Sequence, residues 1–422
     1  MLATVSSIDT LISDEHLTET LCELVNTRSP TGEEASLAGQ ISARLRRYGV
    51  NADTQSFNKS QANAIGRIDG EGDKSLLLYA PLDTVTSDHA EEDLPWAGPE
   101  LRDDMRACAF VEDGHVFGLG AHNPKGHAAC ILETARVLAV MDTKLAGNLF
   151  FGFGAGGMPT HSRPGLPEDT GHGVGCRHLV ESLPPMDGAI IAKSGTSVTW
   201  EEVGFVWLEV TVAGKHNYVG ARHLMPYDNA IANAAQLILQ LEEWFDTYAA
   251  RNASENCRPQ GTVAHMSSGW ERMPAFTPEC AKFLIDLRFT PEQTAEGVEK
   301  EFAEALKTFS AALNLQTSYR VTQTINASRT PPTSPVIKTA IRVWESIHGQ
   351  PHIPFTVMSG ATDANILRGL GIPTARIGLA KAKLPNIDFA LGMNCVALSE
   401  LRQLTKFLTL SVLNFLGEKS DG

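Results

Sequence analysis

Residues 76–85 read LLLYAPLDTV, and they indicate both a strand and a site at its end. The apolar run before Pro81 is typical of a strand that is buried on both faces. The run leads to Asp83, at the end of the strand where an α/β sheet presents its functional side chains. Pro81 itself cannot bind a metal, act as a base or donate a hydrogen bond. The site at this strand end therefore has to rely on Asp83 alone.

Further apolar runs alternate with helical patterns up to about residue 197, which is typical of a parallel-rich α/β sheet with helices on its faces. The segments are LLLYA (76–80), GHAACILETARVLAVM (126–141), NLFFGFGA (148–155) and GAIIAK (188–193).

Between residues 203 and 327 the pattern changes to strand, helix, strand, helix, strand, and it predicts a two-layer α+β unit. We expect the second of these helices to begin with Thr290 as N-cap and Pro291 in its first turn. After the Pro-rich joint SRTPPTSP at 328–335, the α/β pattern returns. The sequence thus predicts an α/β domain in two pieces, 1–202 and 328–422, with an inserted domain at 203–327.

Composition argues against two classes of partner. The formal net charge is −14 without a dense lysine and arginine cluster, so a nucleic-acid backbone would be repelled. No stretch approaches the roughly 18–20 continuous apolar residues that span a bilayer. Residues 1–21 read as an amphipathic helix rather than as a signal sequence. The seven cysteines show no CxxC spacing, and we expect a reduced, cytoplasmic protein.

Six motifs, taken in order, resemble the zinc-dependent aminoacylases, acetylornithine and succinyl-diaminopimelate deacylases and carboxypeptidases that share one metallopeptidase fold. The resemblance implies a catalytic α/β domain with an inserted ferredoxin-like lid, and we expect a homodimer formed through that lid. The motifs are LVNTRSPTGEE (24–34), LLLYAPLDTV (76–85), GLGAHNPKGHAACILE (118–133), PYDNAIANAAQLI (226–238), DLRFTP (286–291) and SGATDANILRGLGIPTARIG (359–378).

The metal ligands that the resemblance implies are replaced in this sequence. The His of the His-x-Asp motif is Pro81, and the aspartate that bridges the two zinc ions is Asn123. The remaining ligand and base positions fall on Gly157, Met158, Lys193, Ala390 and Asn394. A cluster of carboxylates without metal would suffer repulsion and desolvation, so a site that lost its metals should also lose its acids. We therefore expect no metal cofactor.

Lys193 would bring a fixed positive charge close to Asp83, and we expect the two to form an ion pair at the former metal position. On one interpretation, the pair only neutralises a buried carboxylate. On the other, Lys193 acts as base, nucleophile or carbonyl polariser.

Four residues of the inserted domain are candidates through the resemblance. Tyr218 takes the position of a histidine that steadies the reacting carbonyl, with His216 as the rival assignment. Arg288 matches an arginine that grips a substrate carboxylate, a task suited to the planar guanidinium. Asn229 matches an asparagine that faces the cleft, although it is also placed to begin the long helix of the lid.

Three residues of the α/β domain have both a structural and a functional interpretation. Asn123 and Lys125 stand in a strand-to-helix turn, and they either shape the turn or act at the site, Asn123 as a catalytic residue and Lys125 in substrate binding. Asp363, in SGATDA, either binds substrate or caps the next helix, through its own side chain or that of Thr362.

Histidines near the expected site leave one metal hypothesis open. Several imidazoles together can build a zinc site with different ligands, although the spacings match no known ligand pattern. The histidines in question are His122, His127, His161, His172 and His178.

Two function classes follow from these residues. The first is an enzyme for a small carboxylate-bearing amide or amino-acid-like molecule, with metal-independent acid–base or acyl-transfer chemistry by Lys193, Asp83 and Tyr218. The second is a catalytically silent homologue that binds a small ligand or a partner protein. A hydrolase with a relocated histidine metal site is the third alternative.

Overall fold

The computed structural model describes residues 5–142 and 144–417, and these fall into two compact units. The first unit contains the described residues of 1–200, 330–354 and 362–422. The second unit contains residues 201–329 and 355–361. Among the described residues, no helix is both long and apolar enough to cross a membrane.

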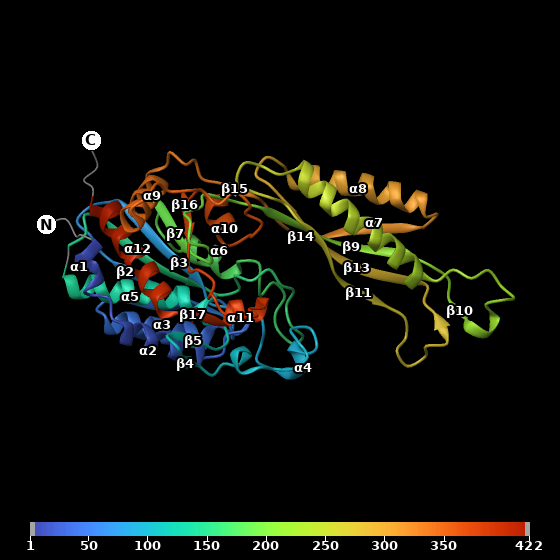
Figure 1. Cartoon of the computed structure of the whole chain (residues 1–422), viewed down its shortest axis with the longest axis horizontal. Helices are drawn as coiled ribbons and strands as arrows, with labels where there is room; N and C mark the ends of the chain where they lie inside the picture. Colours follow the sequence, from blue (N-terminus) through green and yellow to red (C-terminus); the bar gives the residue numbers. More distant parts are fainter. Residues whose placement is uncertain (1–4, 143, 418–422) are drawn as a thin grey trace. The chain divides into compact units, whose positions relative to one another are not determined.

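A six-stranded sheet with the order β1-β2-β6-β3-β7-β16 forms the centre of the first unit (Figure 1). The four strands β6, β3, β7 and β16 run parallel to one another, whereas β2 pairs antiparallel with both β6 and β1. The strands are β1 (Asn51–Ser56), β2 (Ala62–Ile68), β3 (Ser75–Pro81), β6 (Asn148–Gly154), β7 (Gly188–Ala192) and β16 (Thr374–Ile377).

Helices cover both faces of this sheet, because side chains along each strand alternate between the faces. In β3, Leu76 and Leu78 pack into one apolar cluster, while Leu77 and Tyr79 pack into another. The first cluster is covered by α2 (Asp14–Val25), α3 (Ala35–Arg47), α5 (Lys125–Met141), α9 (Pro335–His348) and α12 (Leu398–Gly417). The second is covered by α6 (Val174–Glu181) and α10 (Ala364–Gly369).

Shorter elements complete the first unit. A small antiparallel sheet has the order β17-β5-β4, and α11 leads directly into β17. These elements are α1 (Val5–Asp9), α4 (Ala90–Asp93), β4 (Phe110–Glu112), β5 (His115–Phe117), α11 (Phe389–Asn394) and β17 (Cys395–Ala397).

The second unit has a four-stranded antiparallel sheet, β11-β13-β9-β14, which α7 and α8 cover. Thr294 caps α8, because its side chain accepts the N–H of Gly297 at 3.1 Å. The predicted start at Thr290 and Pro291 was therefore wrong by about one turn. The elements are β9 (Gly204–Ala213), α7 (Ala230–Arg251), β11 (Gly261–Ser268), β13 (Cys280–Phe289), α8 (Ala295–Ala312) and β14 (Thr317–Ile325).

The longer segment of the second unit, residues 201–329, begins and ends on paired strands. β8 (Glu201–Glu202) pairs with β15 (Ser328–Arg329), and just outside them the N–H of Thr330 donates to the carbonyl of Trp200 at 2.8 Å. An inserted α+β domain within a mixed α/β protein confirms the predicted fold class.

Candidate functional site

The ends of the four parallel strands meet at one edge of the central sheet, as parallel strands require. Asp83 follows β3, and Gly157 and Met158 follow β6. Lys193 follows β7, and Gly378 follows β16. The structure therefore brings together most of the α/β positions that the sequence singled out.

Asp83 is fully buried and accepts three hydrogen bonds. The backbone N–H of Gly157 donates to one oxygen at 2.8 Å, and the N–H of Met158 donates to the other at 2.8 Å. The hydroxyl of Thr31 donates to that second oxygen at 2.7 Å. These bonds take the place of the predicted ion pair with Lys193. The carboxylate of Asp83 thus fixes the loop that follows β6.

Glu34 is a second buried carboxyl group beside Asp83, and it was not predicted from the sequence. Its Oε1 accepts the N–H of Gly32 at 3.1 Å and of Gly156 at 2.8 Å. Its Oε2 has no hydrogen-bond partner in the part of the chain that the structure describes. Burial, and next the charge of Asp83, raise the pKa of Glu34 to about 8. Nothing in the sequence distinguishes Glu34 from its exposed neighbour Glu33.

Two buried histidines, His122 and His127, lie close to Lys193. Their ring centroids are 5.5 Å apart. Nε2 of His122 lies 3.1 Å from the carbonyl of Ala380, so this nitrogen carries the proton, whereas Nε2 of His127 accepts the N–H of Leu379 at 3.3 Å. Burial lowers the pKa of His122 to about 4 and holds the pKa of His127 well below its usual value, and the charge of Lys193 adds to both shifts. Both imidazoles are therefore neutral at physiological pH.

Asn123 and Asn394 lie in the same region of the first unit. The Asn394 side chain accepts the N–H of Gly120 at 2.9 Å and donates to Asp104 at 3.4 Å. The Asn123 Nδ2 lies 3.6 Å from the sulfur of Met393, while its buried Oδ1 has no hydrogen-bond partner among the described residues. The side chain of Asn394 is thus fixed by hydrogen bonds to Gly120 and Asp104, whereas the Oδ1 of Asn123 could still accept a hydrogen bond.

Lys125 is buried and donates to the backbone carbonyls of Thr27, at 2.8 Å, and Val25, at 3.4 Å. Burial lowers its pKa to about 7. These contacts support the structural interpretation of Lys125.

Asp363 accepts a hydrogen bond from the hydroxyl of Tyr79 at 2.6 Å, and both side chains are buried. It precedes α10, but its side chain makes no capping bond there. The Thr362 hydroxyl instead accepts the N–H of Ala364 at 3.1 Å. Capping by Asp363 itself was therefore wrong, and the alternative through Thr362 is the one observed.

The other four candidates belong to the second unit. Asn229 caps α7 by accepting the N–H of Ile231 at 3.0 Å. Arg288 donates to both oxygens of Asp286, at 3.2 and 3.1 Å, and to the Ser359 carbonyl at 2.8 Å. In the β10–β12 pair (Asn217–Tyr218 with Phe276–Thr277), Phe276 contacts the ring of His216 and that of half-exposed Tyr218.

The remaining histidines of the relocated-site hypothesis lie elsewhere in the first unit. His161 and His172 form one pair, with ring centroids 6.4 Å apart. His178, in α6, contacts Phe57 with ring centroids 5.2 Å apart. Within residues 5–142 and 144–417, no group of three or more His, Cys, Asp and Glu side chains is arranged to hold a metal ion.

Comparisons with known proteins agree with this architecture. Residues 201–313 match the model of the peptidase dimerisation domain of the M20 family. The chain is 24% identical over 300 residues to carboxypeptidase G2 of Pseudomonas sp. strain RS-16, covering 68% of this chain and 63% of that protein. It is also similar to the crystal structure of an M20 family metallo-carboxypeptidase from Sulfolobus solfataricus, with a TM-score of 0.68 and 15% identity, covering 96% of this chain and all of the other.

The chain has the M20 metallopeptidase fold. A second curated relative is N-formyl-4-amino-5-aminomethyl-2-methylpyrimidine deformylase of Halalkalibacterium halodurans, 23% identical over 302 residues, covering 69% of this chain and 66% of that protein. The chain thus aligns with just under two thirds of the length of each curated relative.

The residues present do not fit the two metal ions that the resemblance to zinc enzymes implies. At the positions of the expected ligands, Pro81 and Gly157 offer no side-chain donor, and Lys193 offers a cation. Asp83 survives, but both of its oxygens already accept hydrogen bonds. A dinuclear site needs several anionic or imidazole ligands to balance its charge.

Proposed function

We propose that the protein acts on the amide bond of a small molecule at the carboxyl edge of the central sheet, and that it does so without the pair of zinc ions. The two curated relatives named above support the reaction class, since one is named a carboxypeptidase and the other a deformylase. The residues at the expected ligand positions, Pro81, Gly157 and Lys193, support a reaction that needs no metal ion.

The position of Lys193 is the observation that carries this proposal. The positive charge of Lys193 contributes to the lowered pKa values of His122 and His127. Lys193 follows β7 at the edge of the sheet, where the resemblance expects an acidic ligand. A fixed cation in such a place can polarise a substrate carbonyl, so that the oxygen of a water molecule bonds to the carbonyl carbon. The C–N bond then breaks as a proton from that water passes to the departing nitrogen, which leaves as the amine. Asp83 is then a positioning residue, because its hydrogen bonds hold the loop after β6.

A hydrolysis screen of N-acyl amino acids, with and without chelator, tests this function. We expect turnover that the chelator leaves intact and that Lys193→Met abolishes. Lys383→Met is the matched control, because Lys383 is an exposed lysine of the same unit. Turnover that the chelator removes would overturn the metal-independent reaction.

A silent homologue that binds a ligand is the second candidate, and the contacts of two predicted site residues favour it. Asp83 and Arg288 are both engaged by neighbouring protein groups. A carboxylate ligand would have to compete with Asp286 for the guanidinium of Arg288. Saturable binding without turnover in the same screen would support this candidate over the enzyme.

We also propose that two copies of the chain associate through the second unit. The match of residues 201–313 to a peptidase dimerisation domain supports this assembly. Analytical ultracentrifugation should give twice the chain mass of 45.5 kDa at micromolar concentration. A sedimenting species of single mass across that range would contradict it.

A further inference from the structure

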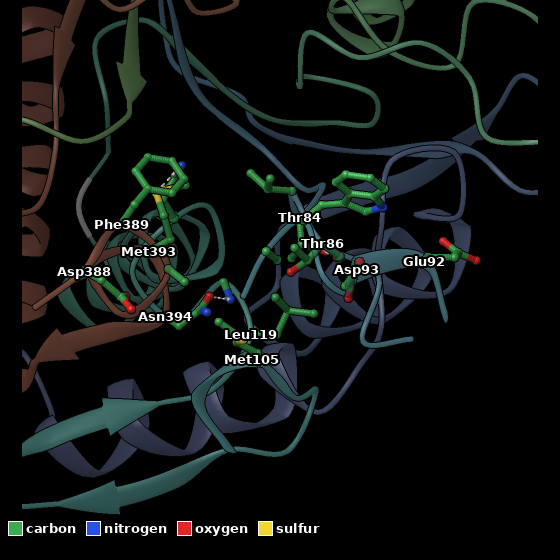
Figure 2. A pocket seen from close by; sticks show the side chains of 16 residues that line it. Thr84, Thr86, Glu92, Asp93, Met105, Leu119, Asp388, Phe389, Met393 and Asn394 are labelled. Carbon is green, nitrogen blue, oxygen red and sulfur yellow. Dashed lines mark hydrogen bonds between the residues drawn. The ribbon is translucent and has the colours of Figure 1, made fainter. Parts of the chain in front are cut away.

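A pocket of about 540 Å³ opens in the first unit beside the loop that follows β3 (Figure 2). Phe389 and Met393 lie on one side of it, and Thr84 and Thr86 on the other. Leu119 lies below Thr86 in this view. The pocket is thus built entirely within one compact unit.

Large apolar side chains around this pocket are exposed to solvent. Trp96 is 85% exposed, Phe389 69% and Val85 59%, and all three line the pocket. Exposed aromatic side chains that gather at a concave site are a mark of ligand binding. A flat apolar group bound between these side chains would bury their apolar surface. The binding free energy would become more favourable by about 25 cal/mol for each Å² of apolar surface removed from water.

The charges around the pocket disfavour an anionic group. Among the described residues that line it there is no lysine or arginine, but there are three acids. Asp388 is paired with Arg102 at 2.8 Å and Glu92 with Arg163 at 2.9 Å. The third, Asp93, accepts bonds from the backbone N–H and hydroxyl of Ser87. These partners satisfy the acids themselves and leave no cation for a ligand carboxylate.

Asn123 supplies one polar contact for a ligand. Its side chain lines the pocket and is only 6% exposed. Its Oδ1 has no hydrogen-bond partner in residues 5–142 and 144–417, and the weak contact of Nδ2 with the Met393 sulfur orients the amide. A buried acceptor left unpaired costs free energy, so a ligand that donates an N–H to it would be favoured.

We propose that this pocket binds an uncharged, flat apolar group that carries an N–H donor, such as an aromatic amide. The ring lies between Trp96 and Phe389, and the amide N–H donates to Oδ1 of Asn123. This inference concerns binding, so it holds whether or not the protein turns a substrate over.

Three probes that share one ring test the pocket. These are 2-naphthamide, methyl 2-naphthoate and 2-naphthoate, and their affinities for the full chain are measured by ligand-observed NMR titration. We expect the amide to bind at least about tenfold more tightly than the ester, because it alone donates an N–H, a difference of about 1.4 kcal/mol. We expect the carboxylate to bind most weakly. Equal affinities, or tightest binding of the carboxylate, would overturn the proposal.

Substitutions of the exposed aromatic residues Trp96 and Phe389 test where the ring binds. Because both side chains are exposed, these substitutions should not destabilise the fold. Trp96→Ala and Phe389→Ala should each weaken the amide and the ester alike, by about tenfold or more. Trp270→Ala is the matched control, since Trp270 is 57% exposed and belongs to the second unit. Unchanged affinity in both pocket variants would show that the ring binds elsewhere.

Asn123→Leu separates the ring contact from the hydrogen bond. In a folded variant, the affinity of the amide should fall to that of the ester, while the affinity of the ester stays unchanged. An unchanged amide affinity in that variant would remove Asn123 from the proposal. If Asn123→Leu does not fold, the comparison of the three probes still tests the need for an N–H donor.

Discussion

A Cβ atom built on Gly157 would lie 2.6 Å from the Cβ of Pro81 and 3.0 Å from Oδ2 of Asp363. The first distance is shorter than real carbon contacts allow. Position 157, where the resemblance expects a glutamate, therefore has no room for a side chain on this backbone, because any residue except glycine at position 81 would carry the same Cβ. Glycine at position 157 is thus required by how closely the loop after β6 approaches the end of β3.

Gly157→Ala should destabilise the protein by about 1–3 kcal/mol, because the added methyl group would clash with the Cβ of Pro81. Urea unfolding measures this change. Gly39→Ala is the control, since Gly39 lies inside α3 with open space around it, and this change should stabilise by about 0.5–1 kcal/mol. Pro81→Gly removes the clashing atom, so the double variant should lose less stability than the sum of the two single changes.

Stability should fall as the pH rises from about 4.5 to about 8, because the pKa of Glu34 is raised from 4.5 in the unfolded chain to about 8 in the fold. The folded state holds this proton more tightly than the unfolded state, so the contribution is full below the lower value and lost through the upper one. Glu34→Gln should flatten this part of the stability profile in urea unfolding. Glu33→Gln, at the exposed neighbour, should leave it unchanged, and a flat wild-type profile would contradict the assignment.

Asp83→Asn should cost about 1–3 kcal/mol of stability, because the new amide group places its N–H₂ against a backbone N–H that needs an acceptor. Thermal unfolding measures the loss. Thr31→Val removes only one of the three bonds and should cost less. A stable Asp83→Asn variant that loses only turnover would instead make Asp83 a catalytic residue.

Asn229→Ala should destabilise the second unit by about 1 kcal/mol, since it removes the N-cap of α7. Asn229→Ser keeps a capping oxygen and should retain stability. If Asn229 also contacts the substrate, the serine variant will show a raised KM at unchanged stability, whereas an unchanged KM restricts Asn229 to the cap.

Apolar patterning predicted the elements whose burial leaves a mark in the sequence. The run ending at Pro81 is β3, and every residue of that strand is buried. In contrast, β11 went unrecognised because most of its side chains are exposed. The N-cap of α8 was misplaced because Thr290 and Thr294 offer the same chemistry one turn apart.

The site was less predictable, because backbone groups satisfy its charges. Asp83 was expected to pair with Lys193, but the N–H groups of Gly157 and Met158 are the partners that the fold supplies. Side-chain patterns carry no sign of such donors. Glu34 escaped notice for the same reason, since its partners are the N–H groups of Gly32 and Gly156.

The hydrogen bond between Thr330 and Trp200 has a consequence for folding order. Because the host chain leaves and re-enters at adjacent points, its own contacts can form on either side of the insertion with little extra entropy cost from a long loop. The central sheet can then form independently of residues 201–329, and a short turn in place of that segment would leave the strand order of the sheet unaltered.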